Sequence, residues 1–307
     1  MRYILVMFLM VVFMEFSVPV GVSATDTASP SLTPEQWGGQ TFLFHSMPKD
    51  RQEEGYEIFK TTDADRGWVG DRSVRLPYAA HVYKRVRVTS VIDFPAGTGQ
   101  TEYLIYMTEV NTGMKLVGRT MRGQLEGLLL ESDLNQARSQ FLGKKVYVKK
   151  RFLQMEDSLG SGSVPQVIPT KIGSEAKVVN IYDGVRTDKP IWLVVSVDGK
   201  RAIMPIAYSW SNISVSDWKQ TLPWQEELFT EDDPRSSFGW SEEVWDKIDA
   251  GLVDKEMTKK QVELSWGSPL NILENPIGSG DSVWSYGSSV LTFNGDTLIL
   301  IDNMCEK

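Results

Sequence analysis

Residues whose types could support chemistry are few in this sequence of 307 residues. His45 and His81 are the two histidines, and with Asp63 or Asp65 they could share a metal ion. A zinc site usually needs several His or Cys ligands, whereas the one cysteine, Cys305, lies near the C-terminus. Residues 63–67 begin like a calcium loop but lack its later ligands, so a turn is the better interpretation. We therefore expect no metal site.

Adjacent acidic pairs are the other candidates for chemistry, at residues 53–54, 226–227 and 232–233. Neighbours in sequence do not face each other, so this spacing does not predict a catalytic pair of carboxylates. The sequence also has no Gly-x-Ser-x-Gly elbow and no Gly-x-x-x-x-Gly-Lys phosphate loop. We expect no catalytic residue and no cofactor, and a hydrolase is the least favoured hypothesis.

Two groups of residues could instead bind a partner. A basic cluster, Lys144, Lys145, Lys149, Lys150 and Arg151, surrounds an apolar segment. We interpret it as an edge strand that lysines protect from aggregation, and the alternative is a surface for anionic polymers or lipid headgroups. Some tryptophans fall in expected loops and could line a groove for a peptide or a glycan, although most would close the cores. These are Trp68, Trp210, Trp218 and Trp224.

The N-terminus predicts export. In residues 1–24 a charged Arg2 precedes an apolar run, and Ala24 ends a segment typical of a signal-peptidase site. The run from Tyr3 to Phe13 is shorter than the roughly 20 residues that span a membrane, although a retained anchor is the alternative. No cysteine follows this segment, so lipid anchoring by that route is not expected. The formal charge of −8 argues against nucleic-acid binding.

The elements between residues 25 and 237 predict a duplicated β unit. After a flexible leader (25–36), strands near residues 39–44, 86–91 and 103–107 have counterparts near 143–148, 176–181 and 191–195. The offset of roughly 90 to 100 residues predicts two small β-barrels, a pattern that weakly resembles bacterial SH3-like barrels. We predict a first module at 37–123, a connecting helix or linker at 124–140, a second module at 141–223 and an acidic linker at 224–237.

Beyond residue 238 the apolar period changes to that of helices. Ser241 can cap a first helix that ends at Gly251, and Thr258 with Gln261 forms a capping box for a second helix. Met257 and Val262 are placed for a hydrophobic staple, and Trp266 brings the helix to the core. Gly267 and Pro269 then end it, and four short antiparallel strands are predicted at 271–273, 283–286, 289–293 and 297–301. The expected fold is mainly β, with a C-terminal α+β domain at 238–307.

Several of these residues carry a family resemblance. Met257-Thr258-x-x-Gln261-Val262, Trp266-Gly267-x-Pro269 and Trp284-x-Tyr286 together resemble the BamE-like (SmpA/OmlA) family over about 65 residues. The resemblance implies two helices followed by a β-meander, and protein binding in outer-membrane assembly. Glu256 stands where the family has glycine, and the lipid-accepting cysteine of the family namesake is missing.

The sequence thus predicts an exported, non-enzymatic interaction or scaffold protein of the cell envelope. Its location would be the periplasm or the periphery of the outer membrane, and its partners envelope proteins. The expected contact surface comprises the exposed face of the second helix and the loops near residues 266–271 and 277–282. The alternative is a protein whose β modules bind cell-wall glycan or peptide, and peptidoglycan or the inner leaflet of the outer membrane are then further candidate partners.

Overall fold

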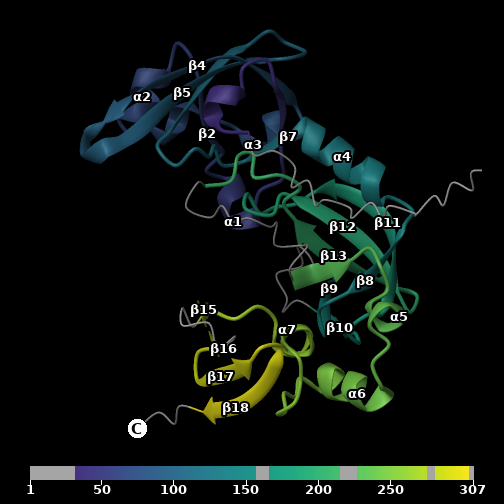
Figure 1. The fold of residues 1–307 in the computed structure, drawn as a ribbon. Coiled ribbons are helices and arrows are strands. Elements are labelled where there is room, and N and C mark those ends of the chain that lie inside the picture. The colour runs from purple at the N-terminus through teal and green to yellow at the C-terminus, as the bar shows by residue number, and fades with distance from the viewer. Residues whose placement is uncertain (1–31, 157–165, 215–226, 275–280, 304–307) are drawn as a thin grey trace, which may run out of the picture.

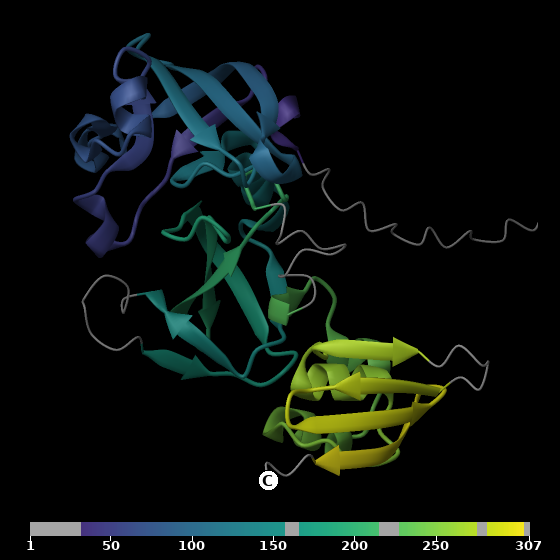
Figure 2. The same cartoon turned by 90° about the vertical axis from the view of Figure 1, so that its left-hand side faces the viewer.

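The computed structural model describes residues 32–156, 166–214, 227–274 and 281–303. The predicted signal peptide lies outside these ranges. Figures 1 and 2 show three units that follow one another along the molecule, and each is built on one antiparallel sheet. We refer to residues 32–130 as the first unit, 131–230 as the second unit and 234–303 as the C-terminal unit. Among the helices described, none has the length and apolar character needed to span a membrane.

The first unit contains a seven-stranded sheet in the order β3-β2-β6-β5-β4-β1-β7. Its strands are β1 (Thr41–Phe44), β2 (Tyr56–Lys60), β3 (Arg75–Leu76), β4 (Arg85–Ala96), β5 (Gln100–Glu109), β6 (Lys115–Thr120) and β7 (Leu128–Leu130). The connections hold the short helices α1 (Lys49–Gln52), α2 (Ala64–Trp68) and α3 (Tyr78–His81), and the 3-10 turns Pro34–Gln36, Arg72–Val74 and Gly97–Gly99.

The second unit repeats this strand order as β10-β9-β13-β12-β11-β8-β14. Its elements are α4 (Glu131–Phe141), β8 (Lys145–Val148), β9 (Phe152–Met155), β10 (Val167–Pro169), β11 (Glu175–Asp183), β12 (Ile191–Val197), β13 (Lys200–Ile206) and β14 (Phe229–Thr230). The correspondence extends to local detail. The N–H groups of Gly39 and Gly143 each donate to the carbonyl of a valine, Val88 or Val178, at 2.9 Å, and a β-bulge follows that valine in both sheets.

The first two units share an apolar contact that runs through β1 and β7. Leu43 and Leu129 are directly paired across these strands, and both pack against the core of the second unit. Their neighbours Leu128 and Leu130 point the other way, into the core of the first unit. Since successive side chains of a strand point to opposite faces, β7 is buried on both sides.

Two segments differ from the sequence prediction. Residues 124–140 are not simply a helix or linker, because β7 completes the first sheet before α4 begins. Three consecutive leucines buried on both faces have no period that distinguishes a strand from a helix. In the predicted linker 224–237, β14 pairs with β8, and Phe229 is buried against Phe141 with ring centroids 5.4 Å apart. The interpretation of that segment as a solvated spacer is wrong at Phe229.

The C-terminal unit contains three helices, α5 (Pro234–Phe238), α6 (Glu242–Ala250) and α7 (Lys259–Trp266). A four-stranded meander follows, with β15 (Asn271–Glu274), β16 (Asp281–Ser285), β17 (Ser289–Asn294) and β18 (Thr297–Asn303) in sequential order. Figure 2 shows α6 and α7 behind one face of this sheet. Trp245 and Ile248 of α6, Val262 of α7, and Trp284 and Phe293 of the sheet are members of the core between these layers. The two helices and four strands expected here from sequence are all present.

Candidate functional site

The start of α7 follows from four residues that the sequence analysis singled out. The main-chain N–H of Thr258 donates to Gln261 Oε1 at 2.8 Å, and the N–H of Gln261 donates back to Thr258 Oγ1 at 3.3 Å. This capping box satisfies two N–H groups that a helix start otherwise leaves without partners. Met257 and Val262 are both buried in the core of the C-terminal unit. The predicted capping box at the start of this helix is confirmed.

The end of α7 is held by two aromatic side chains. Trp266 Nε1 donates to the carbonyl of Gly251 at 2.9 Å, and the Tyr286 hydroxyl donates to the carbonyl of Gly267 at 2.8 Å. The two rings meet edge to face with centroids 5.3 Å apart. Gly267 has φ 83° and ψ −169°, a combination that is essentially restricted to glycine. Pro269 follows in the turn to β15, and Trp284 is buried in the core beside Phe293.

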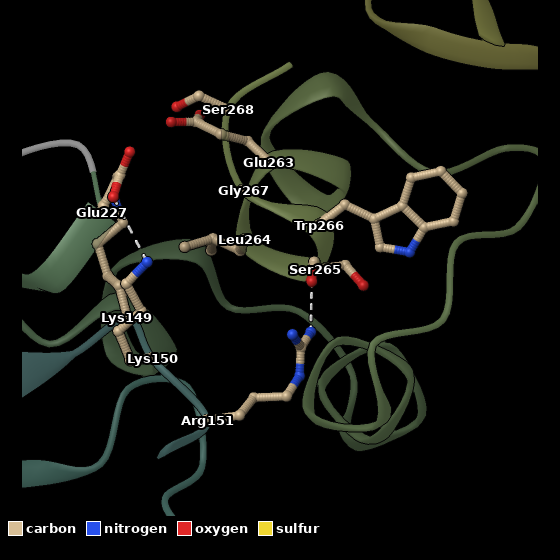
Figure 3. Close-up of a pocket in the computed structure, with 10 residues that line it drawn as sticks. All are labelled: Lys149, Lys150, Arg151, Glu227, Glu263, Leu264, Ser265, Trp266, Gly267 and Ser268. Carbon is tan, nitrogen blue, oxygen red and sulfur yellow. Dashed lines mark hydrogen bonds and ion pairs between the residues drawn. The ribbon is translucent and has the colours of Figure 1, made fainter. Parts of the chain in front are cut away.

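Arg151 connects this corner to the second unit. Its Nε donates to the carbonyl of Asp249 at 2.9 Å, and its Nη2 donates to the carbonyls of Ile248, at 2.6 Å, and Ser265. Figure 3 shows the guanidinium below the last turn of α7. These carbonyls lie at the C-terminal ends of α6 and α7, where the helix dipole is negative. The Ile248 carbonyl also accepts from the N–H of Gly251 at 3.0 Å. One cation therefore caps two helices.

A second set of contacts joins the same two units. Arg235 donates to the carbonyl of Ile172 at 3.0 Å and to Asp249 Oδ2 at 2.7 Å, while Asp249 Oδ1 accepts from the N–H of Ile172 at 2.9 Å. The guanidinium of Arg235 lies 4.6 Å from the ring centroid of Trp245. Ile172 comes from the second unit, yet it is buried in the core of the C-terminal unit. We call the contacts of Arg151, Arg235, Asp249 and Ile172 the junction.

A pocket of about 230 Å³ opens beside the junction. Figure 3 shows that three residues of the basic cluster, Lys149, Lys150 and Arg151, line it together with the Trp266–Gly267 corner. Its charges are engaged within the protein: Lys150 lies 3.5 Å from Glu227, and Lys260 lies 2.9 Å from Glu263. Partial burial lowers the pKa of Arg151, which Asp249 opposes. The arrangement is suited to holding two units together.

The interpretation of the basic cluster as a protected edge strand is wrong. β8 carries Lys145 and lies between β11 and β14, so it has a neighbouring strand on each side. Lys145 pairs with Glu175 of β11 at 2.9 Å on the surface. The lysines suggested an edge strand because the strand that covers one side of β8 could not be recognised in the sequence. That strand, β14, has two residues and lies about 80 residues away in an acidic segment.

The true edge strand next to the corner is β15. All four of its residues are exposed, and Leu270, Ile272 and Leu273 have exposed fractions of 80%, 46% and 60%. Only β16 pairs with it in the described sheet. We call residues 270–274 the contact strand. They overlap the loop that the sequence analysis named as part of a contact surface.

The remaining candidates are distributed over the first two units. His81 is buried beside Glu109, with His81 Nδ1 2.9 Å from Glu109 Oε2, while His45 contacts the second unit. Burial lowers the pKa of both histidines. Among the residues described, no group of three or more His, Cys, Asp or Glu could hold a metal ion. Trp210 is buried in the second core and Trp68 lies beside a surface pocket, whereas Trp218 and Trp224 lie outside the described residues.

Comparison of the chain with protein-family models, curated proteins and solved structures finds no match.

Proposed function

We propose that this protein is an exported, non-enzymatic interaction or scaffold protein of the bacterial cell envelope, linked to outer-membrane assembly or integrity. The observation that carries the proposal is the contact strand, which lies at the edge of a sheet in a unit that the junction attaches to the second unit. Two helices followed by a four-stranded meander are the order of elements that the BamE-like resemblance implies. Glu256, at the family's glycine position, has φ 73°, in the region that favours glycine.

The contact strand would bind an extended segment of another envelope protein. An edge strand leaves a row of N–H and C=O groups for another strand to pair with, which is the basis of β-augmentation. Ile272 and Leu273 point to opposite faces of the sheet, so an added strand would find apolar contacts on both faces. Between residues 239 and 303 the chain has eleven acidic residues and four lysines. This charge favours a basic segment as the partner over a second copy of the chain.

Site-specific photo-crosslinking in a double-membraned bacterium tests this proposal. A photoreactive residue at position 273 is expected to yield a discrete crosslinked product in the envelope fraction. The matched control is position 69 in the first unit, where Val69 is 86% exposed but lies on no sheet edge. A cytosolic location, or the same products from both positions, would contradict the proposal.

A second candidate function is binding of cell-wall glycan or peptide by the β units. The observation that favours it is a pocket of about 310 Å³ in the first unit, lined by Trp68, Glu102 and Arg119. Trp68 Nε1 is buried there without a hydrogen-bond partner, and the guanidinium of Arg119 lies 5.7 Å from the Trp68 ring centroid. An aromatic face beside polar groups suits a sugar or a peptide side chain.

Sedimentation with purified peptidoglycan distinguishes the two functions. If the second candidate holds, Trp68→Ala should abolish co-sedimentation of the full chain, whereas Phe152→Ala, at an exposed aromatic residue of the second unit, should not. Absence of binding by the unaltered protein would remove this candidate and leave the first.

A further inference from the structure

The face of the C-terminal sheet that points away from α6 and α7 carries a row of apolar side chains. Leu273 pairs with Val283, Val283 pairs with Thr292, and Thr292 pairs with Leu300, so the row crosses all four strands. Successive side chains of a strand point to opposite faces, and Leu291, next to Thr292, is in the core. The row therefore lies on the open face. Figure 2 looks onto this face, and none of the described elements lies in front of it.

The row is accessible from outside the protein. Leu273 and Leu300 have exposed fractions of 60% and 42%, and Val283 and Thr292 between them are half-buried. A β-bulge in β18 places Ile299 beside Leu300 opposite Thr292, and Ile299 is 47% exposed. We call these five residues the apolar row. Contiguous exposed apolar side chains of this kind mark a binding surface.

The charge of this sheet has one sign. Residues 268–303 contain four acidic residues and no Lys, Arg or His. Asp302 pairs with Val290 on one side of the apolar row, and Asp281 pairs with Asn294 on the other side. Both positions are an even number of residues from the row, so both carboxylates belong to the open face. A partner that covers the row meets a carboxylate at each margin, which favours a partner with cations there.

The sheet backbone limits what can lie on this face. β16 and β17 each have a neighbouring strand on both sides, so their N–H and C=O groups pair within the sheet and the face offers side chains only. An occupant must then satisfy its own main-chain hydrogen bonds, which an α-helix does and an extended segment does not. Neighbouring strands are about 4.8 Å apart and helix turns about 5.4 Å apart, so a helix across the strands places about one apolar side chain over each strand.

We propose that the open face binds a basic amphipathic α-helix of a partner protein, with the apolar stripe of the helix on the apolar row and its cations beside Asp281 and Asp302. The row spans three strand spacings, about 14 Å, so about ten residues of helix cover it. A second copy of the chain would bring carboxylates against carboxylates, and anionic lipid headgroups would meet the same repulsion. The inference does not depend on strand pairing at β15, because Leu300 and Asp302 lie on β18 at the opposite edge of the sheet.

Fluorescence anisotropy of a labelled peptide tests the proposal on the full chain. The probe is a peptide of about 18 Leu and Lys residues in which Leu recurs at every third or fourth position, the period of one helix face. We expect saturable one-to-one binding that weakens at high salt, because salt screens the charge pairs. A peptide of the same composition without the helical period should bind at least about tenfold more weakly, since it presents no continuous apolar stripe.

Leu300→Thr removes apolar area from the row and keeps a residue that favours strands. We expect it to weaken peptide binding by about fivefold or more, because the helix would cover the exposed part of Leu300. Leu252→Thr is the matched control and should bind as the unaltered protein does. Leu252 is 55% exposed in the same unit, but it directly follows α6 in the helical layer.

The charge at the margin is tested separately. Asp302→Asn should weaken binding by about two- to fivefold, the range of an exposed ion pair. Asp246→Asn is its control, because Asp246 is equally exposed in the same unit but lies on α6. Thermal melts of all four variants establish that each is folded.

Several results would overturn the proposal. Absence of saturable binding, equal binding of the two peptides, or equal losses in Leu300→Thr and Leu252→Thr would show that the row binds no helix. A dimer that Leu300→Thr dissociates in sedimentation would assign the face to a second copy, and capture by anionic vesicles that Leu300→Thr abolishes would assign it to a membrane. Loss of the crosslink at position 273 with peptide binding intact would instead contradict the proposed function alone.

Discussion

Arg151 Nη2 donates a hydrogen bond to the main-chain carbonyl of Ile248 at 2.6 Å, although 97 residues separate the two in sequence. The same guanidinium reaches Asp249 and Ser265, so a residue that follows β8 caps two helices of the next unit. Together with the contacts of Ile172 to Asp249 and Arg235, this side chain attaches the C-terminal unit to the second unit.

Arg151→Leu should destabilise the C-terminal unit by about 2–4 kcal/mol. The change removes hydrogen bonds from a charged donor, each worth roughly 1.5–3 kcal/mol, and leaves carbonyls at two helix ends without this donor. Chemical denaturation followed by tryptophan fluorescence measures it. Lys145→Leu is the control from the same basic cluster, because its ion pair with Glu175 is exposed and its loss should leave the unfolding midpoint nearly unchanged. Equal effects of the two substitutions would contradict the role of the junction.

Gly267→Ala should lower stability by about 1–3 kcal/mol, and Gly267→Val by more. A side chain at this position would meet no atom within 4 Å, so the cost comes from the backbone at φ 83° and not from a clash. Thermal melts measure the change. Gly38→Ala is the control, because Gly38 also has open space around it but no positive φ. An unchanged midpoint for both Gly267 variants would rule out this account of the corner.

Glu256→Gly should have the opposite sign. Glu256 is exposed with φ 73°, and its N–H donates to the carbonyl of Leu298 at 2.8 Å, a bond that glycine keeps. Relief of the left-handed backbone is worth roughly 1–2 kcal/mol, partly offset by the greater freedom of glycine in the unfolded chain. We expect a melting temperature equal to or above that of the unaltered protein. A clear decrease would show that the Glu256 side chain stabilises the fold.

Asp133 should make stability depend on pH. Burial raises its pKa to about 6, and the hydrogen bond from Ser209 at 2.5 Å opposes the rise. Because the folded pKa lies above the unfolded one, the folded state binds more protons between about pH 4 and 6, and this group's contribution to stability falls as pH rises through that window. The folded pKa of Asp133 lies about two above its ordinary value, which corresponds to a change of about 3 kcal/mol in the free energy of unfolding across this window.

The test for Asp133 compares urea midpoints at pH 4 and pH 7.5 in the unaltered protein and in Asp133→Asn. Asparagine retains an acceptor for Ser209 but does not titrate in this range. The variant should therefore gain stability relative to the unaltered protein at pH 7.5 and lose that advantage at pH 4. An identical pH dependence of the two proteins would mean that the pKa of Asp133 is not raised.

Asn212 should couple the first two units. It is buried at φ 58°, its Oδ1 accepts from the N–H of Leu125 at 2.7 Å, and its Nδ2 donates to the carbonyls of Leu125 and Leu128 at 2.8 and 2.6 Å. Asn212→Asp preserves the shape but places a carboxylate oxygen against two carbonyls. We expect it to destabilise by at least about 2 kcal/mol, measured by chemical denaturation. If Asn212→Asp is as stable as the unaltered protein, these contacts do not hold the units together.

Local signals in the sequence were sufficient for the start and end of α7. The Thr258–Gln261 capping box, the staple of Met257 and Val262, and the glycine at position 267 all act within a few residues of one another, so their spacing already encodes the geometry. The four strands of the meander are likewise separated by short turns, and neighbours in sequence are neighbours in the sheet.

Contacts between distant segments depended on the tertiary structure. Leu129 and Phe229 belong to strands whose partners lie far along the chain, and no local period shows which face each strand buries. Nothing in the sequence distinguishes Arg151 from the other cations of the basic cluster. The tertiary structure places it at the ends of two helices. Composition and local spacing determined the mainly β character, the repeat pattern and the shape of the C-terminal corner. The placement of the three units, the junction and the contact of His45 with the second unit were decided by long-range packing. Burial and hydrogen bonding between remote segments select partners that sequence spacing does not specify.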